Sequence, residues 1–315
     1  MHAESETSEK PYGHLTPKLM LQLAAPHTWP AAVMPALVAT CFALALHGTV
    51  SVLMAVVLLL ICVLMQASVN TFNDYFDYVK GTDSADDNVE ATDATLVYNN
   101  VNPRSALALA IGMLVCAFAL GVYVIVQAGW IPLVLGIIGA VIVVLYSAGK
   151  TPISYLPIGE LVSGVVMGGL IPLACQQALC GYLDFRMIIF ALPTMIGVGL
   201  IMMTNNTCDI EKDIEANRRT LPALLGRECA RRVYHGLVWV WLIAIIVIVC
   251  VFFTGAGFLI VVFMLFGCIP LLKALLANPL VPASRIGAMA QICSVNIALG
   301  AFYAAAILAS RCSMW

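Results

Sequence analysis

The chain has 315 residues, of which 62% are hydrophobic and only 10% are charged, and its mean hydropathy is +0.99. Most of a chain with this composition cannot face water, which excludes a soluble protein. The 15 Lys and Arg residues against 17 Asp and Glu residues give a formal net charge of −2, too near balance for a basic surface that binds nucleic acid. The composition therefore predicts an integral membrane protein that contacts membrane lipid and no nucleic acid.

Nine segments are apolar enough to be membrane helices, each of which needs about 20 mostly apolar residues. They are residues 29–47, 51–73, 104–127, 131–148, 158–180, 186–206, 231–254, 257–277 and 286–311. Prolines at or inside several of these segments predict kinked helices. We therefore expect an all-α membrane protein with a cytoplasmic tail at 1–25 and a single transmembrane domain at 26–315, interrupted by polar loops at about 74–103 and 207–230.

The distribution of charge predicts how these helices are oriented. With nine spans, all but two of the 15 basic residues fall on one side, and only Arg186 and Arg311 fall on the other. The positive-inside rule therefore places the N-terminus in the cytoplasm and the C-terminus outside. Every acidic residue except Asp184 also falls on the cytoplasmic side, which indicates that this face carries the functional groups.

Two of the predicted helices end in matching groups of amides and carboxylates. The end of the second segment carries Asn70, Asn73, Asp74 and Asp77, with Lys80 and Asp83 just beyond. If the helix continues this far, residues 70, 74 and 77 share one face. The end of the sixth segment carries Asn205, Asn206, Asp209 and Asp213. Residues 206, 209 and 213 share a face by the same helical spacing.

Oxygen ligands of this kind suit Mg²⁺, which is usually held by one or two carboxylates together with substrate phosphates. Two such groups facing each other across a cavity would hold two or more Mg²⁺ ions around a diphosphate. For any single Asp at the end of a span, an ordinary solvated loop residue is the alternative, since charges there cost little. The duplication on one side of the membrane favours the metal site.

Both groups belong to segments that resemble known motifs. Residues 70–77, Asn-Thr-Phe-Asn-Asp-Tyr-Phe-Asp, and residues 205–213, Asn-Asn-Thr-Cys-Asp-Ile-Glu-Lys-Asp, resemble the two aspartate-rich motifs of the UbiA superfamily of intramembrane prenyltransferases. Residues 26–35, 146–155 and 159–160 are similar to those of the members that prenylate 1,4-dihydroxy-2-naphthoate in menaquinone synthesis. The resemblance extends from about residue 25 to about residue 305.

The resemblance implies a bundle of nine transmembrane helices with a cavity open to the cytoplasmic side. The implied catalytic and metal-binding residues are Asp74, Asp77, Asp209 and Asp213, and the further implied metal ligands are Asn70, Asn206 and Asp83. Two or more Mg²⁺ ions held there would neutralise the charge that develops on the diphosphate of a polyprenyl diphosphate. An aromatic ring carbon would attack the resulting allylic cation, while apolar helix walls hold the isoprenoid tail and exclude water.

Further residues on the predicted cytoplasmic side are candidates for substrate binding, because basic groups suit phosphate and aromatic rings stabilise cations. The predicted substrate-binding residues are Asn70, Asn73, Lys80, Tyr146, Lys150, Tyr155, Asn205, Asn206, Lys212 and Arg218. Glu160 stands at the start of the fifth segment. We expect it to cap that helix, with orientation of Lys150 or of a substrate hydroxyl as the alternatives.

The implied reaction transfers the polyprenyl group to 1,4-dihydroxy-2-naphthoate, releases carbon dioxide and yields demethylmenaquinol. Two features depart from the family pattern: residues 81–103 contain no Lys or Arg, and Cys208 stands where many relatives have arginine. Prenylation of another aromatic acceptor, such as 4-hydroxybenzoate, is therefore an alternative, although the Asn-Asp-Tyr start of the first motif, its spacing to Asp83 and residues 146–160 argue against it. A cation transporter is disfavoured, because the acidic residues avoid the middle of the spans.

Overall fold

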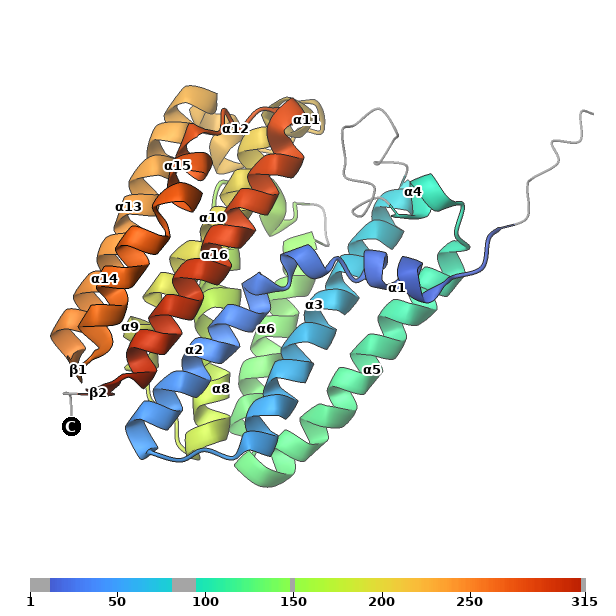
Figure 1. The fold of residues 1–315 in the computed structure, drawn as a ribbon. Coiled ribbons are helices and arrows are strands. Elements are labelled where there is room, and N and C mark those ends of the chain that lie inside the picture. Colours follow the sequence, from blue (N-terminus) through green and yellow to red (C-terminus); the bar gives the residue numbers. More distant parts are fainter. Residues whose placement is uncertain (1–11, 81–94, 148–150, 313–315) are drawn as a thin grey trace, which may run out of the picture. The chain divides into compact units, whose positions relative to one another are not determined.

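The computed structural model describes residues 12–80, 95–147 and 151–312, and helices joined by short connections dominate it (Figure 1). The helices are α1 (Pro17–Leu23), α2 (Pro30–His47), α3 (Val52–Lys80), α4 (Thr95–Asn99), α5 (Pro103–Ala128), α6 (Ile131–Ser147), α7 (Gly159–Val165), α8 (Ile171–Cys180), α9 (Met187–Phe190), α10 (Leu192–Cys208), α11 (Ile210–Glu215), α12 (Leu221–Leu225), α13 (Arg227–Phe252), α14 (Gly257–Gly267), α15 (Ile269–Ala277) and α16 (Arg285–Leu308). Two short strands, β1 (Phe253–Gly255) and β2 (Ser310–Cys312), pair antiparallel.

Each of the nine predicted apolar segments contains a helix or two successive helices. Within the described ranges, six helical stretches are long and apolar enough to cross a membrane, and the bent pair α14–α15 makes up to seven. Such helices satisfy their backbone hydrogen bonds internally, as a lipid environment requires. The chain is therefore a multi-pass membrane protein. The main difference in boundaries is at α3, which continues past the predicted end at residue 73 to Lys80.

Prolines interrupt several helices, as predicted. The axes of α14 and α15 differ by 46°, and Pro270 is the second residue of α15. A π-helical segment, Val166–Leu170, separates α7 from α8, and Pro172 is the second residue of α8. Proline has no backbone N–H and clashes with the preceding turn, so the regular ladder of hydrogen bonds cannot pass through it.

The described chain forms two compact units. The smaller comprises the described part of Met1–Pro26 together with Met65–Val115, and the larger comprises His27–Leu64 together with Cys116–Trp315. In the smaller unit α1 contacts α4. Its buried apolar cluster is formed by Leu23, Leu96, Val101 and Ala106. A single transmembrane domain at 26–315 stays a prediction.

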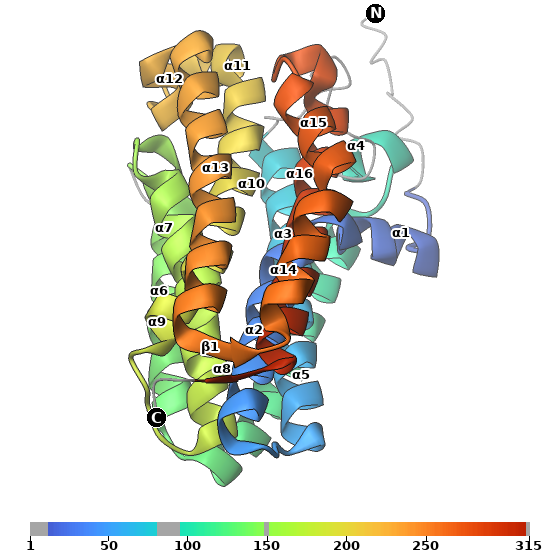
Figure 2. The ribbon, with the colours of Figure 1, turned by 60° about the vertical axis from the view of Figure 1, so that its left-hand side comes forward.

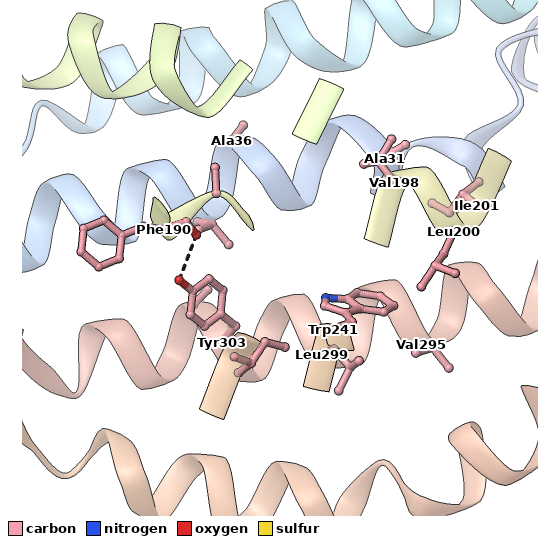
Figure 3. Packing of buried hydrophobic residues seen from close by; sticks show 14 of the residues in the cluster. Ala31, Ala36, Phe190, Val198, Leu200, Ile201, Trp241, Val295, Leu299 and Tyr303 are labelled. Atoms are coloured by element: carbon pink, nitrogen blue, oxygen red, sulfur yellow. Dashed lines mark hydrogen bonds between the residues drawn. The ribbon is translucent and has the colours of Figure 1, made fainter. Parts of the chain in front are cut away.

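The larger unit is organised around α16, which packs against α2, α10 and α14 (Figure 2). Apolar side chains fill the space between these helices, and the buried phenol groups have hydrogen-bond partners. Tyr303 donates to Phe190 O at 2.9 Å, as Figure 3 shows, and Tyr234 Oη accepts from Thr204 Oγ1 at 2.9 Å. An unpaired buried polar group would cost about 1–3 kcal/mol, so these bonds fix how the helices are rotated.

The outer face of α13 is apolar as well as the inner one. Its exposed side chains follow helical spacing and include Trp239, Ile243, Val247 and Val251. Its buried side chains include Tyr234, Val238, Trp241 and Ile245. A continuous exposed apolar face is stable against lipid rather than water, which agrees with a membrane-spanning helix.

Glycines let α10 approach the π-helical segment closely. A Cβ added to Gly168 would lie 2.5 Å from Met195 N and closer still to Met195 Cα. Gly164 meets the same turn, since a Cβ there would lie 2.5 Å from Met195 O. Thr194 Oγ1 donates to Gly168 O at 2.6 Å across this contact. The close approach holds α10, whose C-terminal end carries the second motif.

Candidate functional site

The second motif lies where α10 ends and α11 begins. One continuous helix was expected through residues 206, 209 and 213, but α10 ends at Cys208 and α11 begins at Ile210. Asp209 stands between them with φ −101° and ψ 19°. Its N–H donates to Asn205 O at 3.1 Å, and Asp213 N donates to Asp209 O at 2.8 Å. The helix is therefore interrupted without leaving these backbone groups unpaired.

Arg285, the first residue of α16, links Asn205 to Asp209. Its Nε lies 3.1 Å from Asp209 Oδ2, and its Nη2 donates to Asn205 Oδ1 at 2.6 Å. Both charged side chains are largely buried, with 13% of Arg285 and 20% of Asp209 exposed. In the sequence, Arg285 stands out only as one of the basic residues on the predicted cytoplasmic side. No local spacing could reveal its role, because its partners lie 76 and 80 residues away along the chain.

Asp213 is buried, with 1% of its side chain exposed, and both of its carboxylate oxygens have partners. Oδ1 lies 3.1 Å from Arg218 Nη1, and Oδ2 accepts from Thr220 Oγ1 at 2.8 Å. Arg218 also lies over the Tyr155 ring, with Cζ 5.3 Å from the centroid. Burial raises the pKa of Asp213 above its usual range, although Arg218 and Thr220 oppose the shift. Three predicted site residues thus come together here.

Glu160 and Asn206 form a buried pair between α7 and α10. Asn206 Nδ2 donates to Glu160 Oε1 at 2.8 Å, and the two residues are 3% and 6% exposed. Within the described residues this is the only hydrogen bond of the Glu160 side chain, and Oε2 is buried without a partner. The predicted helix cap is therefore wrong, because the side chain reaches α10 instead. The Tyr146 hydroxyl is close by, 3.4 Å from the position of a Cβ added to Gly159.

Arg227, the first residue of α13, holds the junction of α10 and α11. Its Nη1 and Nη2 donate to the two carboxylate oxygens of Glu211 at 2.6 and 2.7 Å. Nη2 also lies 3.3 Å from Thr207 O, and Nε donates to Leu280 O at 2.9 Å. A bidentate pair of this kind fixes both distance and orientation. Arg227 therefore holds the chain on either side of Asp209. None of these hydrogen bonds involves Asp209 itself.

The pair between Glu211 and Arg227 predicts a pH-dependent stability difference for Glu211→Gln. The hydrogen bond from Arg227 lowers the pKa of Glu211 from 4.5 to about 2. The folded protein thus gains stability from this pair above pH 4.5 and loses it as the pH falls toward 2. Because 57% of the Glu211 side chain is exposed, we expect less than about 1 kcal/mol.

Melting temperatures of the detergent-purified wild type and Glu211→Gln, measured between about pH 3 and about pH 7, check this result. The wild type should melt at the higher temperature near neutral pH, and the two values should converge in acid. A difference that widens as the pH falls would contradict the assignment of the pair.

The first motif lies on α3, whose extension to Lys80 meets the predicted condition for a shared face. Asp74 is 5% exposed, and its carboxylate accepts two backbone N–H groups of α4. Oδ2 accepts from Thr95 N at 2.8 Å, and Oδ1 accepts from Leu96 N at 3.3 Å. A carboxylate at a helix N-terminus satisfies free donors and complements the helix dipole. Asp74 therefore ties α3 to α4 within the smaller unit.

The other predicted residues are placed as follows. Asn70 Nδ2 donates to Ala24 O at 3.0 Å and Asn70 Oδ1 accepts from Gln66 at 3.2 Å, whereas Asn73 is exposed. Lys212 lies within α11, between Glu211 and Asp213. The predictions that fall outside the described residues concern the side chains of Asp77 and Lys80 and the whole of Asp83 and Lys150.

No three Asp, Glu, His or Cys side chains of the described ranges gather at a single point. The donors at the α10–α11 junction nevertheless fit Mg²⁺ by their chemistry, because Asp209, Asp213 and Asn205 offer the hard oxygen ligands that this ion prefers. Their partners, Arg285 and Arg218, carry the guanidinium groups that suit phosphate oxygens. This junction therefore places oxygen ligands of the kind that suit a cation next to guanidinium groups of the kind that suit an anion.

Comparison with known proteins identifies the family. Residues 32–309 match the UbiA prenyltransferase family, and the chain belongs to it. The chain is 30% identical over 233 residues to the 1,4-dihydroxy-2-naphthoate octaprenyltransferase of Bacillus subtilis, covering 73% of this chain and 74% of that relative. It is 32% identical over 219 residues to the enzyme of the same name from Mycobacterium tuberculosis, covering 68% and 72%. The predicted class of enzyme, a prenyltransferase, is confirmed.

The fold is similar to that of a UbiA homologue from Archaeoglobus fulgidus solved with DMAPP and Mg²⁺ bound. The TM-score is 0.60 at 17% sequence identity, and the match covers 92% of this chain and 98% of that one. This likeness confirms a helical UbiA fold. Nine spans and a cavity open to the cytoplasmic side stay predictions.

Proposed function

We propose that this prenyltransferase transfers a polyprenyl group from polyprenyl diphosphate to 1,4-dihydroxy-2-naphthoate in menaquinone biosynthesis. The observation that carries the proposal is the pairing of Asp209 with Arg285 and of Asp213 with Arg218 at one helix junction. This arrangement supplies oxygen ligands for a metal ion next to guanidinium groups for a diphosphate. The names of the relatives from Bacillus subtilis and Mycobacterium tuberculosis support the choice of acceptor.

Residues of each motif are proposed metal ligands. The residues that would hold two or more Mg²⁺ ions are Asp74, Asp77, Asp209, Asp213, Asn70, Asn206 and Asp83. When bound, Mg²⁺ neutralises negative charge on the leaving diphosphate. The presence of Mg²⁺ and DMAPP in the Archaeoglobus fulgidus homologue supports this cofactor.

In the proposed reaction the bond between the allylic carbon and the diphosphate oxygen breaks, and a bond forms between that carbon and an aromatic ring carbon. The carboxylate of the acceptor leaves as carbon dioxide, which gives demethylmenaquinol. Arg218 and Arg285 would donate hydrogen bonds to the diphosphate, and Arg218 Nε has no hydrogen-bond partner within the described residues. Apolar helices around the prenyl tail would keep water from the allylic cation.

We also propose nine spans, with the N-terminus in the cytoplasm, the C-terminus outside and the cavity open to the cytoplasmic side. The six long stretches and the pair α14–α15 supply seven of these spans, and the shorter helices α6 and α10 would supply the remaining two. The positions of the basic residues support this orientation.

Purified protein with Mg²⁺, a polyprenyl diphosphate and 1,4-dihydroxy-2-naphthoate should form the prenylated and decarboxylated product, which mass spectrometry identifies. Chelation of Mg²⁺ should abolish the product, and 4-hydroxybenzoate should react poorly under the same conditions. Prenylation of 4-hydroxybenzoate in preference to the naphthoate would overturn the proposed acceptor. Failure with every aromatic acceptor of a panel would overturn the whole proposal.

A further inference from the structure

The larger unit contains a buried carboxylate oxygen that has no hydrogen-bond partner among the described residues. Glu160 lies on the first turn of α7 and is 6% exposed. Asn206 occupies Oε1 at 2.8 Å, whereas Oε2 is buried and has no hydrogen-bond partner among the described residues. Leaving a buried charged group partly unpaired costs free energy, so such an atom calls for an explanation such as a ligand that pairs with it.

The groups near this oxygen belong to the site described above. Asn206 is a residue of the second motif, and the Tyr146 phenol and the Asp213 carboxylate both interact electrostatically with Glu160. The packing of α7 on α10 fixes the Glu160 backbone, because a Cβ added to Gly199 of α10 would lie 3.3 Å from Glu160 O. Glu160 Oε2 is therefore a fixed hydrogen-bond acceptor next to the proposed reaction site.

We propose that Glu160 Oε2 accepts a hydrogen bond from a ring hydroxyl of the aromatic acceptor, an inference that rests on the prenyl transfer proposed above. A carboxylate needs a donor, and of the two substrates only the acceptor has one. The ionised diphosphate has only acceptor oxygens, and the prenyl tail has no polar hydrogen. A phenolic hydroxyl supplies the missing O–H donor.

This hydrogen bond also explains how the ring becomes reactive. A carboxylate on the hydroxyl increases electron density in the ring, which is the nucleophile. As the ring carbon bonds to the allylic cation, electron density leaves the hydroxyl oxygen and its O–H becomes a stronger donor. The bond to Glu160 is thus stronger in the transition state than in the ground state, which is the condition for faster reaction.

The test compares wild type with Glu160→Gln on three acceptors: 1,4-dihydroxy-2-naphthoate and the two analogues that each lack one of its ring hydroxyls. The ratio of kcat/KM for the dihydroxy acceptor to that for a deoxy analogue is measured in each protein, so that the intrinsic reactivity of the ring cancels. For one analogue, this ratio should be about 10- to 100-fold smaller in Glu160→Gln than in wild type. The KM for polyprenyl diphosphate and the Mg²⁺ requirement should not change.

Glu228→Gln is the matched control, because the Glu228 side chain is 96% exposed near the start of α13. It should leave all these ratios as in wild type. Equal losses on all three acceptors, or a raised Mg²⁺ requirement, would overturn the proposal, because Glu160 would then be structural or a metal ligand. If Glu160→Gln does not fold, Glu160→Asp takes its place, and an unchanged ratio there overturns the proposal as well.

The two proposals fail in different ways. If wild type prenylates none of the naphthoate acceptors, the proposed function is wrong. If wild type prenylates them but discriminates equally with and without the Glu160 carboxylate, only the role of Glu160 is wrong.

Discussion

Replacing Asp209 by alanine should lower the turnover number by at least about 10³-fold while the protein stays folded. The variant loses an anionic oxygen ligand of the proposed metal site. Arg285 keeps its bond of 2.6 Å to Asn205 Oδ1, so its charge is not left entirely unpaired. Product formation is measured under saturating Mg²⁺ and donor, and the melting temperature is measured in parallel.

Glu215→Ala is the matched control for Asp209→Ala, because Glu215 is an exposed acid on the neighbouring helix α11. It should keep wild-type turnover.

Asp74→Ala should also abolish turnover if both motifs hold metal, and the lost cap of α4 should reduce stability by about 1 kcal/mol. Unchanged turnover in both Asp74→Ala and Asp209→Ala would show that these carboxylates do not hold the Mg²⁺ that the reaction needs.

Gly168→Ala should lower the free energy of unfolding by about 1–3 kcal/mol, and by more if α10 cannot move. The added methyl group would collide with backbone atoms of Thr194 and Met195, which a rotamer change cannot relieve. Because α10 carries Asn205 and Asn206, separation of the helices should also lower activity. Chemical or thermal unfolding in detergent measures the first effect, and the prenyl-transfer assay measures the second.

Gly236→Ala provides the comparison for Gly168→Ala. Gly236 lies inside α13, and a Cβ added there meets no atom within 4 Å. Alanine in a helix interior is favoured over glycine by up to about 1 kcal/mol, so this variant should be as stable as wild type or more so. Equal stability of the Gly168 and Gly236 variants would show that the close contact of α10 with the π-helical segment is absent.

Local spacing in the sequence picked out several residues that the structure brings together, but it did not predict their contacts. The spacing of Asn206, Asp209 and Asp213 draws attention to the end of the sixth segment, and the structure brings the candidates Arg218 and Tyr155 to Asp213. Helical spacing is a local property, so it can be read from one sequence. The break at Asp209 was missed, because the three residues were treated as one regular helix.

Partners that are distant in the sequence were beyond prediction. Arg285 pairs with Asp209 across 76 residues, and Asn206 pairs with Glu160 across 46. Neither separation along the chain follows from the helical repeat, because each depends on which helices pack together. The cap that Asp74 provides for α4 belongs to the same class, because its donors follow 21 and 22 residues later.

The sequence alone determined that this is a multi-pass membrane protein with a helix in each apolar segment, and its two motifs resembled those of a prenyltransferase family. The physical reason is that lipid demands long apolar stretches, and each stretch is local to the sequence. Only the tertiary structure decided which acidic side chain pairs with which basic side chain. Packing of α7, α10 and α16 assigned Arg285 to Asp209 and left one oxygen of Glu160 without a partner in the part of the chain that the structure describes, because burial makes each polar group depend on the few partners within reach.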